Sequence, residues 1–486
     1  MKLRRALALS AVDRYASMVI GALVVAVMSR ILSPYEVGVT VLGMSVFMIV
    51  DLVRDVPTTY LVQRHELTPG ATRAAFSVML LISILAAVAL CLAAPWLATY
   101  QGEPGLVPFF EVLAMALLLG PFERPATAMF RRVLDFDKVA IVNVSATLTN
   151  ALLAVGLAVL DFSYMSYAWA LLGSNLVALT VARLVSDRRV GLGITVRGWA
   201  EALRIGGGSA LWGLICRLTE TVPHFVFTAY GQLGTVGLYG RAQLVADMPG
   251  KLLFSAIWPV ALPALAAHQR SGAEVKRPVL DAIGLLSAFQ WPGLLVVACL
   301  AHPITLLLLG SRWIEIVPVV QVLILARLFA PLDVVVYPLL MSQGRTLRLV
   351  VSALLPVPLY LTLIPLAAFH GLMAVALCYL LLVPFNSAVG FACIRGPLQL
   401  GLREVGAALR KSFLTSLTSL VGPLLVIAAH GFRFDLSIGQ AVVAGALAAA
   451  GWALGLAATR HPLCYELLRI VNSARQVMAP RLGVRP

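Results

Sequence analysis

Residues 74–98 read AAFSVMLLISILAAVALCLAAPWLA and contain no charged side chain. A helix of roughly 20 residues crosses a bilayer core about 30 Å thick, so this stretch is long enough to span a membrane. Similar apolar blocks recur along the chain, which is 60% hydrophobic and only 12% charged. Soluble domains carry about twice that share of charge. The composition therefore predicts an integral membrane protein.

The apolar blocks predict an all-α integral membrane fold with about fourteen transmembrane helices. Backbone in contact with lipid must satisfy its own hydrogen bonds, and these blocks are continuous rather than alternating, which favours helices over a β-barrel. The predicted spans are 10–30, 37–59, 74–98, 106–126, 138–160, 163–184, 205–229, 233–262, 281–309, 315–341, 346–368, 371–394, 410–429 and 437–459.

The net charge of +15 is read as an orientation signal. Most lysines and arginines fall in loops of one parity, leaving Arg30, Arg312 and Arg433 on the other side. Basic loops stay in the cytoplasm, so both termini are predicted to be cytoplasmic. The same charges are expected to contact anionic lipid and not nucleic acid.

Nothing in the sequence predicts a cofactor, a metal or a disulfide framework. The cysteines form no C-x-x-C pair, and most lie inside or at the ends of apolar blocks. Gly206-Gly207-Gly208 starts an apolar block and does not follow a strand, which argues against a dinucleotide-binding loop. The chain is predicted not to be an enzyme.

Two halves of the chain carry similar short sequences about two hundred residues apart. Val37-Gly38 matches Val236-Gly237, and Pro121-Phe122-Glu123 matches Pro331-Leu332-Asp333. The interpretation is a duplication of six helices, giving two parallel repeats around a central cavity plus two extra helices. The predicted parts are a first lobe at 1–184, a cytoplasmic linker at 185–204, a second lobe at 205–395, the extra helices at 396–459 and a cytoplasmic tail at 460–486.

Arg217 and Arg241 are the charged residues that most strongly indicate a site. A charge at the bilayer centre costs about 2.5–3.5 kcal/mol on insertion scales, so it should face a cavity or a partner. Both arginines lie well inside predicted spans. Glu220, one helical turn from Arg217, is expected to hold it while the cavity is empty.

Other charges within the spans are weaker candidates. Arg54 and Arg14 are predicted to line the cavity as well, although Arg14 could instead reach the inner headgroups. Asp247 and Lys251 have the spacing of a structural ion pair. The residues left as candidates for ion coupling or salt bridges are Glu220, Asp51, Asp55, Asp247, Lys251, Arg327 and Asp333.

Several stretches resemble the polysaccharide flippases of the multidrug/oligosaccharidyl-lipid/polysaccharide exporter superfamily. The resemblance runs from about residue 10 to about residue 395 and rests on small, aromatic and proline residues. Its motifs are residues 29–34 with Val37-Gly38, Arg131-Arg132 with Phe136 and Lys138, Gly237-Leu238-Tyr239 followed by Ala242, Leu244, Pro249, Pro259 and Pro263, and residues 307–310 with Trp313 and Pro318.

The resemblance implies two six-helix lobes, alternating access and export of an undecaprenyl-diphosphate-linked oligosaccharide for exopolysaccharide or O-antigen synthesis. It also implies a location in a bacterial inner membrane, with a polysaccharide polymerase and glycosyltransferases as partners. A diphosphate headgroup needs basic groups, and the planar arginine fork suits phosphate.

Two other functions stay open at this point. A cation-coupled multidrug antiporter of the same superfamily would favour acids and aromatic residues in its cavity, and the close counts of membrane acids and bases do not decide between them. A membrane-embedded polysaccharide polymerase or ligase would need a sizeable outer loop, which the short predicted outer loops disfavour.

Overall fold

The structure of the chain is a computed structural model. It describes the backbone of residues 2–64, 68–133, 135–186, 193–270 and 275–465, and the side chains of these residues apart from 2–14, 63, 205, 206 and 252–270. Helices make up nearly all of the described chain, and no strand occurs in it. The predicted all-α class is therefore confirmed.

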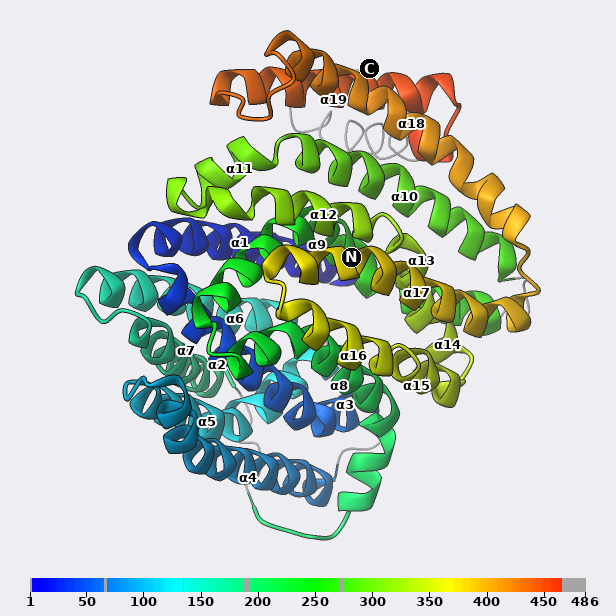
Figure 1. Cartoon of the computed structure of the whole chain (residues 1–486). Coiled ribbons are helices and arrows are strands. Elements are labelled where there is room, and N and C mark those ends of the chain that lie inside the picture. The colour runs from blue at the N-terminus through cyan, green and yellow to red at the C-terminus, as the bar shows by residue number, and fades with distance from the viewer. Residues whose placement is uncertain (1, 65–67, 134, 187–192, 271–274, 466–486) are drawn as a thin grey trace, which may run out of the picture. The chain divides into compact units, whose positions relative to one another are not determined.

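The helices follow one another along the chain (Figure 1). The first part of the chain forms α1 (Lys2–Ile31), α2 (Pro34–Arg54), α3 (Val56–Gln63), α4 (Pro69–Gln101), α5 (Leu106–Arg132), α6 (Phe136–Val159) and α7 (Met165–Leu184). The middle forms α8 (Trp199–Ala229), α9 (Leu233–Arg270), α10 (Lys276–Cys299), α11 (Ala301–Leu308) and the 3₁₀ helix η1 (Ser311–Ile316). The remainder forms α12 (Val317–Arg327), α13 (Pro331–Val334), α14 (Val336–Ser342), α15 (Thr346–Leu354), α16 (Val357–Ala368), α17 (Leu372–Leu398), α18 (Leu402–Ala429) and α19 (Ile438–Ala458).

The described residues contain 10 helices that are long and apolar enough to cross a membrane, or up to 11 if one bent pair counts as a span. This establishes a multi-pass membrane protein. Each of the predicted spans coincides with helix in the structure. The figure of about fourteen spans itself stays a prediction.

Local sequence explains where several helices begin. Ser33 caps α2 and forms a capping box with Glu36, while Pro34 occupies the first turn. Thr68 caps α4 with its side chain, which accepts a hydrogen bond from the Ala71 N–H, and it is again followed by proline. Gly102 ends α4 in the left-handed conformation, with φ of 66°, which glycine adopts without strain.

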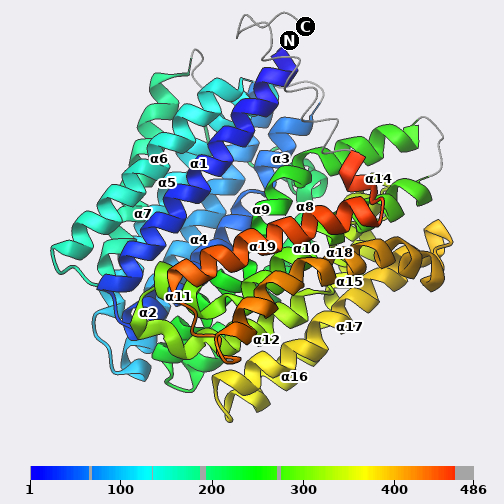
Figure 2. The same cartoon turned by 90° about the horizontal axis from the view of Figure 1, so that it is seen from above.

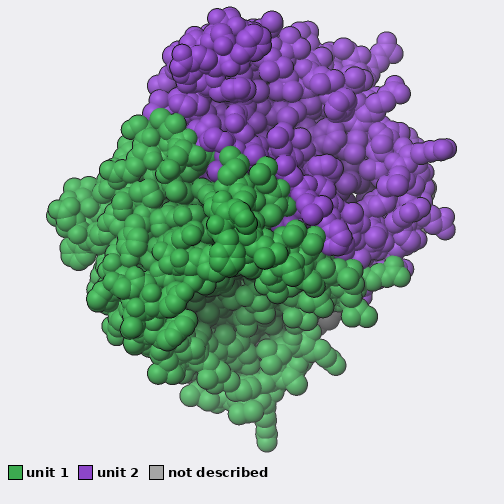
Figure 3. Space-filling view, viewed as in Figure 1, with its two compact units in different colours: residues 1–241, 308–316, 346–378 green, residues 242–307, 317–345, 379–486 purple. Residues whose placement is uncertain are grey.

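The chain divides into two compact units, shown separately by colour in Figure 3. Unit 1 contains residues 1–241, 308–316 and 346–378, and unit 2 contains residues 242–307, 317–345 and 379–486. In unit 1, α4 packs along α5 and α6 packs along α7 (Figure 1). In unit 2, α18 lies between α10 and α19, which Figure 2 shows from above. The two-lobe division and its boundaries stay a prediction.

The predicted span at 315–341 is broken in the structure. The helices on either side of residues 328–330 are bent by 53° relative to each other. Proline has no backbone N–H, so Pro331 cannot continue the helical hydrogen bonds. The backbone just before it forms hydrogen bonds between residues three apart instead of four, such as the bond from the Ala330 N–H to the Arg327 carbonyl at 3.0 Å. This span therefore holds irregular backbone that the apolar pattern did not reveal.

Two glycines bring α2 and α9 into direct backbone contact within unit 1. A Cβ atom added to Gly38 would lie 1.8 Å from the Leu233 carbonyl oxygen, and one added to Gly237 would lie 2.0 Å from the Pro34 carbonyl oxygen. Any side chain would overlap the facing helix, so only glycine permits this approach. The contact joins the two glycines that the proposed repeat makes equivalent.

Candidate substrate site and the charges of the membrane helices

Arg241 is a buried arginine that forms no ion pair among the described residues. It lies in the third turn of α9, and only 6% of its surface is exposed. Its guanidinium carbon is 5.7 Å from the centre of the Trp313 ring, and its Nε atom has no hydrogen-bond partner among the described residues. Burying a cation with an unused hydrogen-bond donor is energetically costly. Binding of an anion to this side chain would therefore be favourable.

The Trp313 ring, over which the Arg241 guanidinium lies, is itself held in place by a hydrogen bond. The tryptophan is fully buried in η1, and its Nε1 donates to the Ser29 carbonyl at the end of α1, at 2.8 Å. Arg312 beside it donates to the Leu32 carbonyl at 3.2 Å. The segment before α12 is thus fixed to the α1–α2 connection, and both lie in unit 1.

Arg217 and Glu220 form an ion pair on α8, with Nη1 and Oε2 3.0 Å apart. Both side chains are substantially exposed, at 43% for Arg217 and 61% for Glu220. Exposed pairs of this kind contribute little to stability, so an incoming anion could displace Glu220. Among the described residues, Arg217 and Arg241 share no interaction partner, so the structure does not join the two predicted site residues.

His224 continues the polar face of α8 toward α2. Its Nδ1 is 2.9 Å from the Ser45 Oγ, and both side chains are buried. The ring also meets Tyr239 of α9 edge-on, with centroids 5.6 Å apart. His224 therefore helps to pack α2, α8 and α9 together in unit 1.

Arg54 is placed differently from the predicted cavity position. Its side chain is 2% exposed and lies between α2 and α5, where Nη1 donates to the Leu117 carbonyl at 2.6 Å and Nη2 bonds to Asp51. Gly120 makes room for it, because a Cβ there would lie 2.3 Å from Nη1. In this arrangement Arg54 is enclosed by protein and offers no surface to a ligand.

Arg124 completes an ion network that the sequence interpretation missed. Its guanidinium reaches Asp51 at 2.7 Å and Asp55 at 2.7 Å, so two acids and two arginines neutralise one another. Removing one member of such a network leaves an uncompensated charge, which is costly in a membrane. We assign Asp51 and Asp55 to this network between α2 and α5.

Asp247 in unit 2 has two basic partners. Lys251, the partner expected from its spacing, is 3.7 Å away, whereas Arg327 of α12 is 2.5 Å away. The shorter contact links α9 to α12, and sequence spacing cannot reveal a partner on another helix. Both arrangements fit a structural role for Asp247, Lys251 and Arg327.

Asp333 differs from these acids because it has no cationic partner among the described residues. It lies in α13, directly after the break, and its Oδ2 accepts from Ser387 Oγ at 3.0 Å and Asn386 Nδ2 at 3.2 Å. The side chain of Arg14, another predicted site residue, lies outside the described residues.

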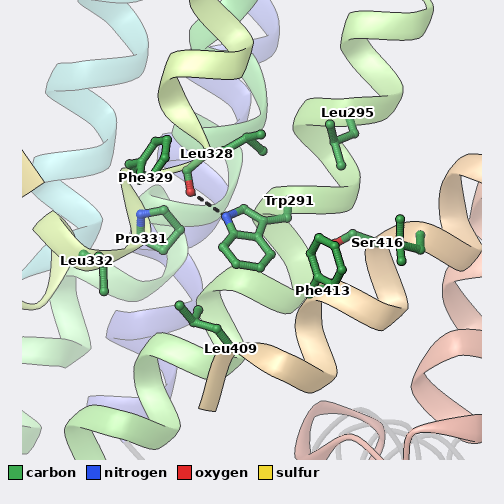
Figure 4. Close-up of a pocket in the computed structure, with 10 residues that line it drawn as sticks. Trp291, Leu295, Leu328, Phe329, Pro331, Leu332, Leu409, Phe413 and Ser416 are labelled. Carbon is green, nitrogen blue, oxygen red and sulfur yellow. Dashed lines mark hydrogen bonds between the residues drawn. The ribbon is translucent and has the colours of Figure 1, made fainter. Parts of the chain in front are cut away.

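An apolar cavity of about 390 Å³ adjoins the break in unit 2 (Figure 4). The Trp291 indole of α10 points at the break and donates to the Leu328 carbonyl at 2.6 Å, which gives that carbonyl a partner. Phe329 and Leu332 line one side, and Phe413 of α18 lines the other. Space therefore exists beside the bent segment.

Comparisons with known proteins agree on the kind of protein. A family model described as polysaccharide biosynthesis protein matches residues 27–318. The chain is 23% identical to the lipopolysaccharide biosynthesis protein WzxC of Escherichia coli K12 over 67% of each chain. It is 24% identical to the succinoglycan biosynthesis transport protein ExoT of Rhizobium meliloti, over 76% of this chain and 75% of the relative.

A solved structure extends the likeness to the fold. The lipid II flippase MurJ, in an inward closed conformation, superposes with a TM-score of 0.70 at 11% identity. The match covers 92% of this chain and 97% of that chain. At this identity the likeness establishes the fold alone.

Proposed function

We propose that this chain, which belongs to the polysaccharide biosynthesis protein family, flips an undecaprenyl-diphosphate-linked oligosaccharide from the inner to the outer leaflet of a bacterial inner membrane by alternating access. The named activities of its relatives support transport in polysaccharide synthesis. The observation that carries the proposal is Arg241, a buried arginine with an unused Nε donor among the described residues, which lies in the predicted span 233–262.

The diphosphate is the part of the substrate that this arginine suits. Hydrogen bonds between arginine and phosphate are charge-assisted and can be bidentate. The Trp313 ring holds the guanidinium in place before the substrate arrives, which reduces the entropy lost on binding. Arg217 then supplies a second cation once the diphosphate displaces Glu220. The lipid tail stays in the bilayer while the sugar crosses.

The proposal assigns the chain no bond-making chemistry. Purified protein in liposomes should move lipid-linked oligosaccharide to the opposite leaflet without releasing lipid diphosphate or building a longer chain. Leaflet position can be followed by access of a lectin or a glycosidase added outside. A time-dependent glycosidic product would make the chain an enzyme, and efflux of cationic drugs without lipid movement would favour the antiporter.

The proposed topology places both termini in the cytoplasm. On that side the basic loops would contact anionic lipid, and glycosyltransferases would assemble the lipid-linked oligosaccharide that is later polymerised. In a background without cysteine, Phe162→Cys and Phe434→Cys should react with a membrane-impermeant maleimide added outside intact cells. Both side chains are exposed, at 46% and 43%.

Val133→Cys and Arg197→Cys provide the opposite set, since both positions are exposed but are assigned to the cytoplasm. They should react only after the cells are opened. Labelling of Arg197→Cys in intact cells would reverse the orientation of the helices around it and would remove the cytoplasmic assignment.

A further inference from the structure

Asp333 combines three features that set it apart from the other acids of the membrane helices. It follows a helix break, it has neutral hydrogen-bond donors, and it has no ion pair among the described residues. Asp51, Asp55 and Asp247 all face arginine. An acid without a cation in a membrane helix is either neutral or paired with something that arrives from outside.

The helices around Asp333 offer no fixed counter-charge. α10 has no titratable residue between Asp281 and Cys299, and Arg327 of α12 is bound to Asp247 at 2.5 Å. The titratable or charged residues on α12, α14, α17 and α18 are Arg327, Tyr337, Cys378, Tyr379, Cys393, Arg395, Arg403, Glu404, Arg410 and Lys411. Among the described residues, no ion pair joins any of them to Asp333.

The two carboxylate oxygens have different surroundings. Oδ2 accepts from both Ser387 and Asn386 of α17. Oδ1 faces Gly390 on the same helix, where a Cβ atom would come within 3.3 Å. Asn386 can donate to Oδ2 whether the acid is charged or neutral, so Oδ2 is an acceptor in both states. Oδ1 is therefore the oxygen with room to carry a proton.

Ser387 connects the state of this acid to the broken helix. Its hydroxyl lies 3.0 Å from Asp333 Oδ2 and 3.2 Å from the Phe329 carbonyl, which belongs to the break itself. A serine has one hydroxyl hydrogen and can donate it to only one of them. A charged carboxylate is a stronger acceptor than the Phe329 carbonyl, whereas a neutral carboxylic acid is not. The hydrogen should move to Phe329 when Asp333 is neutral.

We propose that Asp333 is a proton-binding site that controls the bend between α12 and α14 through Ser387. One proton from water binds Oδ1, the carboxylate charge is lost, and Ser387 turns to the Phe329 carbonyl. Release of the proton reverses both changes. The Trp291 bond to the Leu328 carbonyl stays in either state, and the adjoining cavity gives the segment space to move. The link from this bend to transport rests on the proposed function, but the bend itself does not.

The test measures the bend directly in the full chain. Spin labels on Leu325→Cys and Arg345→Cys, in a cysteine-free background in lipid nanodiscs, report the distance across the break. Both residues belong to unit 2 and both are exposed. The distance distribution should shift between pH 5.5 and pH 8.5. Asp333→Asn, which is neutral at every pH, should give the acidic distribution throughout.

Ser387→Ala should lose most of the shift because it keeps the acid and removes the link. Ser342→Ala is the matched control, since that hydroxyl donates to the Leu339 carbonyl in the same span and not to Asp333. It should shift like the unchanged protein. If Asp333→Asn fails to fold, Ser387→Ala and its control still decide the matter.

Three outcomes would overturn the proposal. They are no shift in the unchanged chain, a full shift in Asp333→Asn, and an acidic distribution produced at pH 8.5 by sodium but not by potassium. The last would assign a sodium ion instead of a proton. A liposome assay with an imposed pH gradient separates the two proposals. Loss of all lipid-linked transport with an intact pH-dependent shift would reject the proposed function and keep the proton site.

Discussion

Arg241→Ala is expected to lose nearly all flipping of lipid-linked oligosaccharide in reconstituted liposomes. Hydrogen bonds to charged groups contribute about 1.5–3 kcal/mol, which corresponds to roughly a tenfold to hundredfold loss in affinity or rate. Arg241→Lys should recover only part of the activity, since lysine keeps the charge without the planar fork. Arg241 has no ion pair in the described part of the chain, so its removal should leave no unpaired opposite charge there and the fold should survive.

Arg433→Ala is the matched control for the arginine variants. That side chain is 72% exposed and pairs with Asp435 on the chain surface, so its loss should leave transport unchanged. Arg217→Ala should lower transport less than Arg241→Ala, because Arg217 is more exposed. Normal transport by the Arg217→Ala, Arg241→Ala double variant, at equal amounts in the membrane, would remove both arginines from the proposed site.

Gly237→Ala is expected to destabilise the protein more than alanine at Gly234 or Gly240 of the same helix. The new Cβ would lie 2.0 Å from the Pro34 carbonyl oxygen and 2.9 Å from the Gly38 nitrogen, both of them backbone atoms that cannot rotate away. Overpacking of this kind costs about 1–3 kcal/mol or more. The purified variant should unfold at a lower temperature than the unchanged chain and should transport poorly.

Gly234→Ala is the control for that variant, because it adds the same methyl group one turn earlier on the same helix. A Cβ there meets nothing within 4 Å, and alanine favours a helix over glycine by about 1 kcal/mol. Gly234→Ala should therefore be as stable as the unchanged chain or more so. Equal unfolding temperatures for the two variants would show that the close approach of α2 and α9 is not required.

The helices could be predicted because apolar length is a local property of the sequence. The break at residues 328–330 was missed although Pro331 was visible, because hydrophobicity continues through it and a proline within a membrane helix does not always bend it. At the 53° bend the Leu328 carbonyl accepts a hydrogen bond from Trp291, which lies on a different helix and which no pattern within this span can indicate.

The partners of the charged residues were the least predictable part. The Arg217–Glu220 pair lies within one turn of α8, so spacing alone indicated it. The sequence pattern predicts a cavity position for Arg54, whereas the structure places it against α5. Its partner Leu117 and the space at Gly120 both belong to α5, and no pattern within α2 can indicate them. Arg124 reaches Asp51 and Asp55 from that same helix, beside two prolines that gave no sign of a charge network.

The contact between Gly38 and Gly237 bears on how a chain of this kind could arise. If the two halves descend from one ancestor, the residues that touch are copies of a single ancestral glycine. That is the contact by which a homodimer meets its own partner across a two-fold axis. Two separate half-length chains could have assembled through it before they were joined. After fusion, neither copy could diverge to a larger residue alone, because each would strike the other half's backbone.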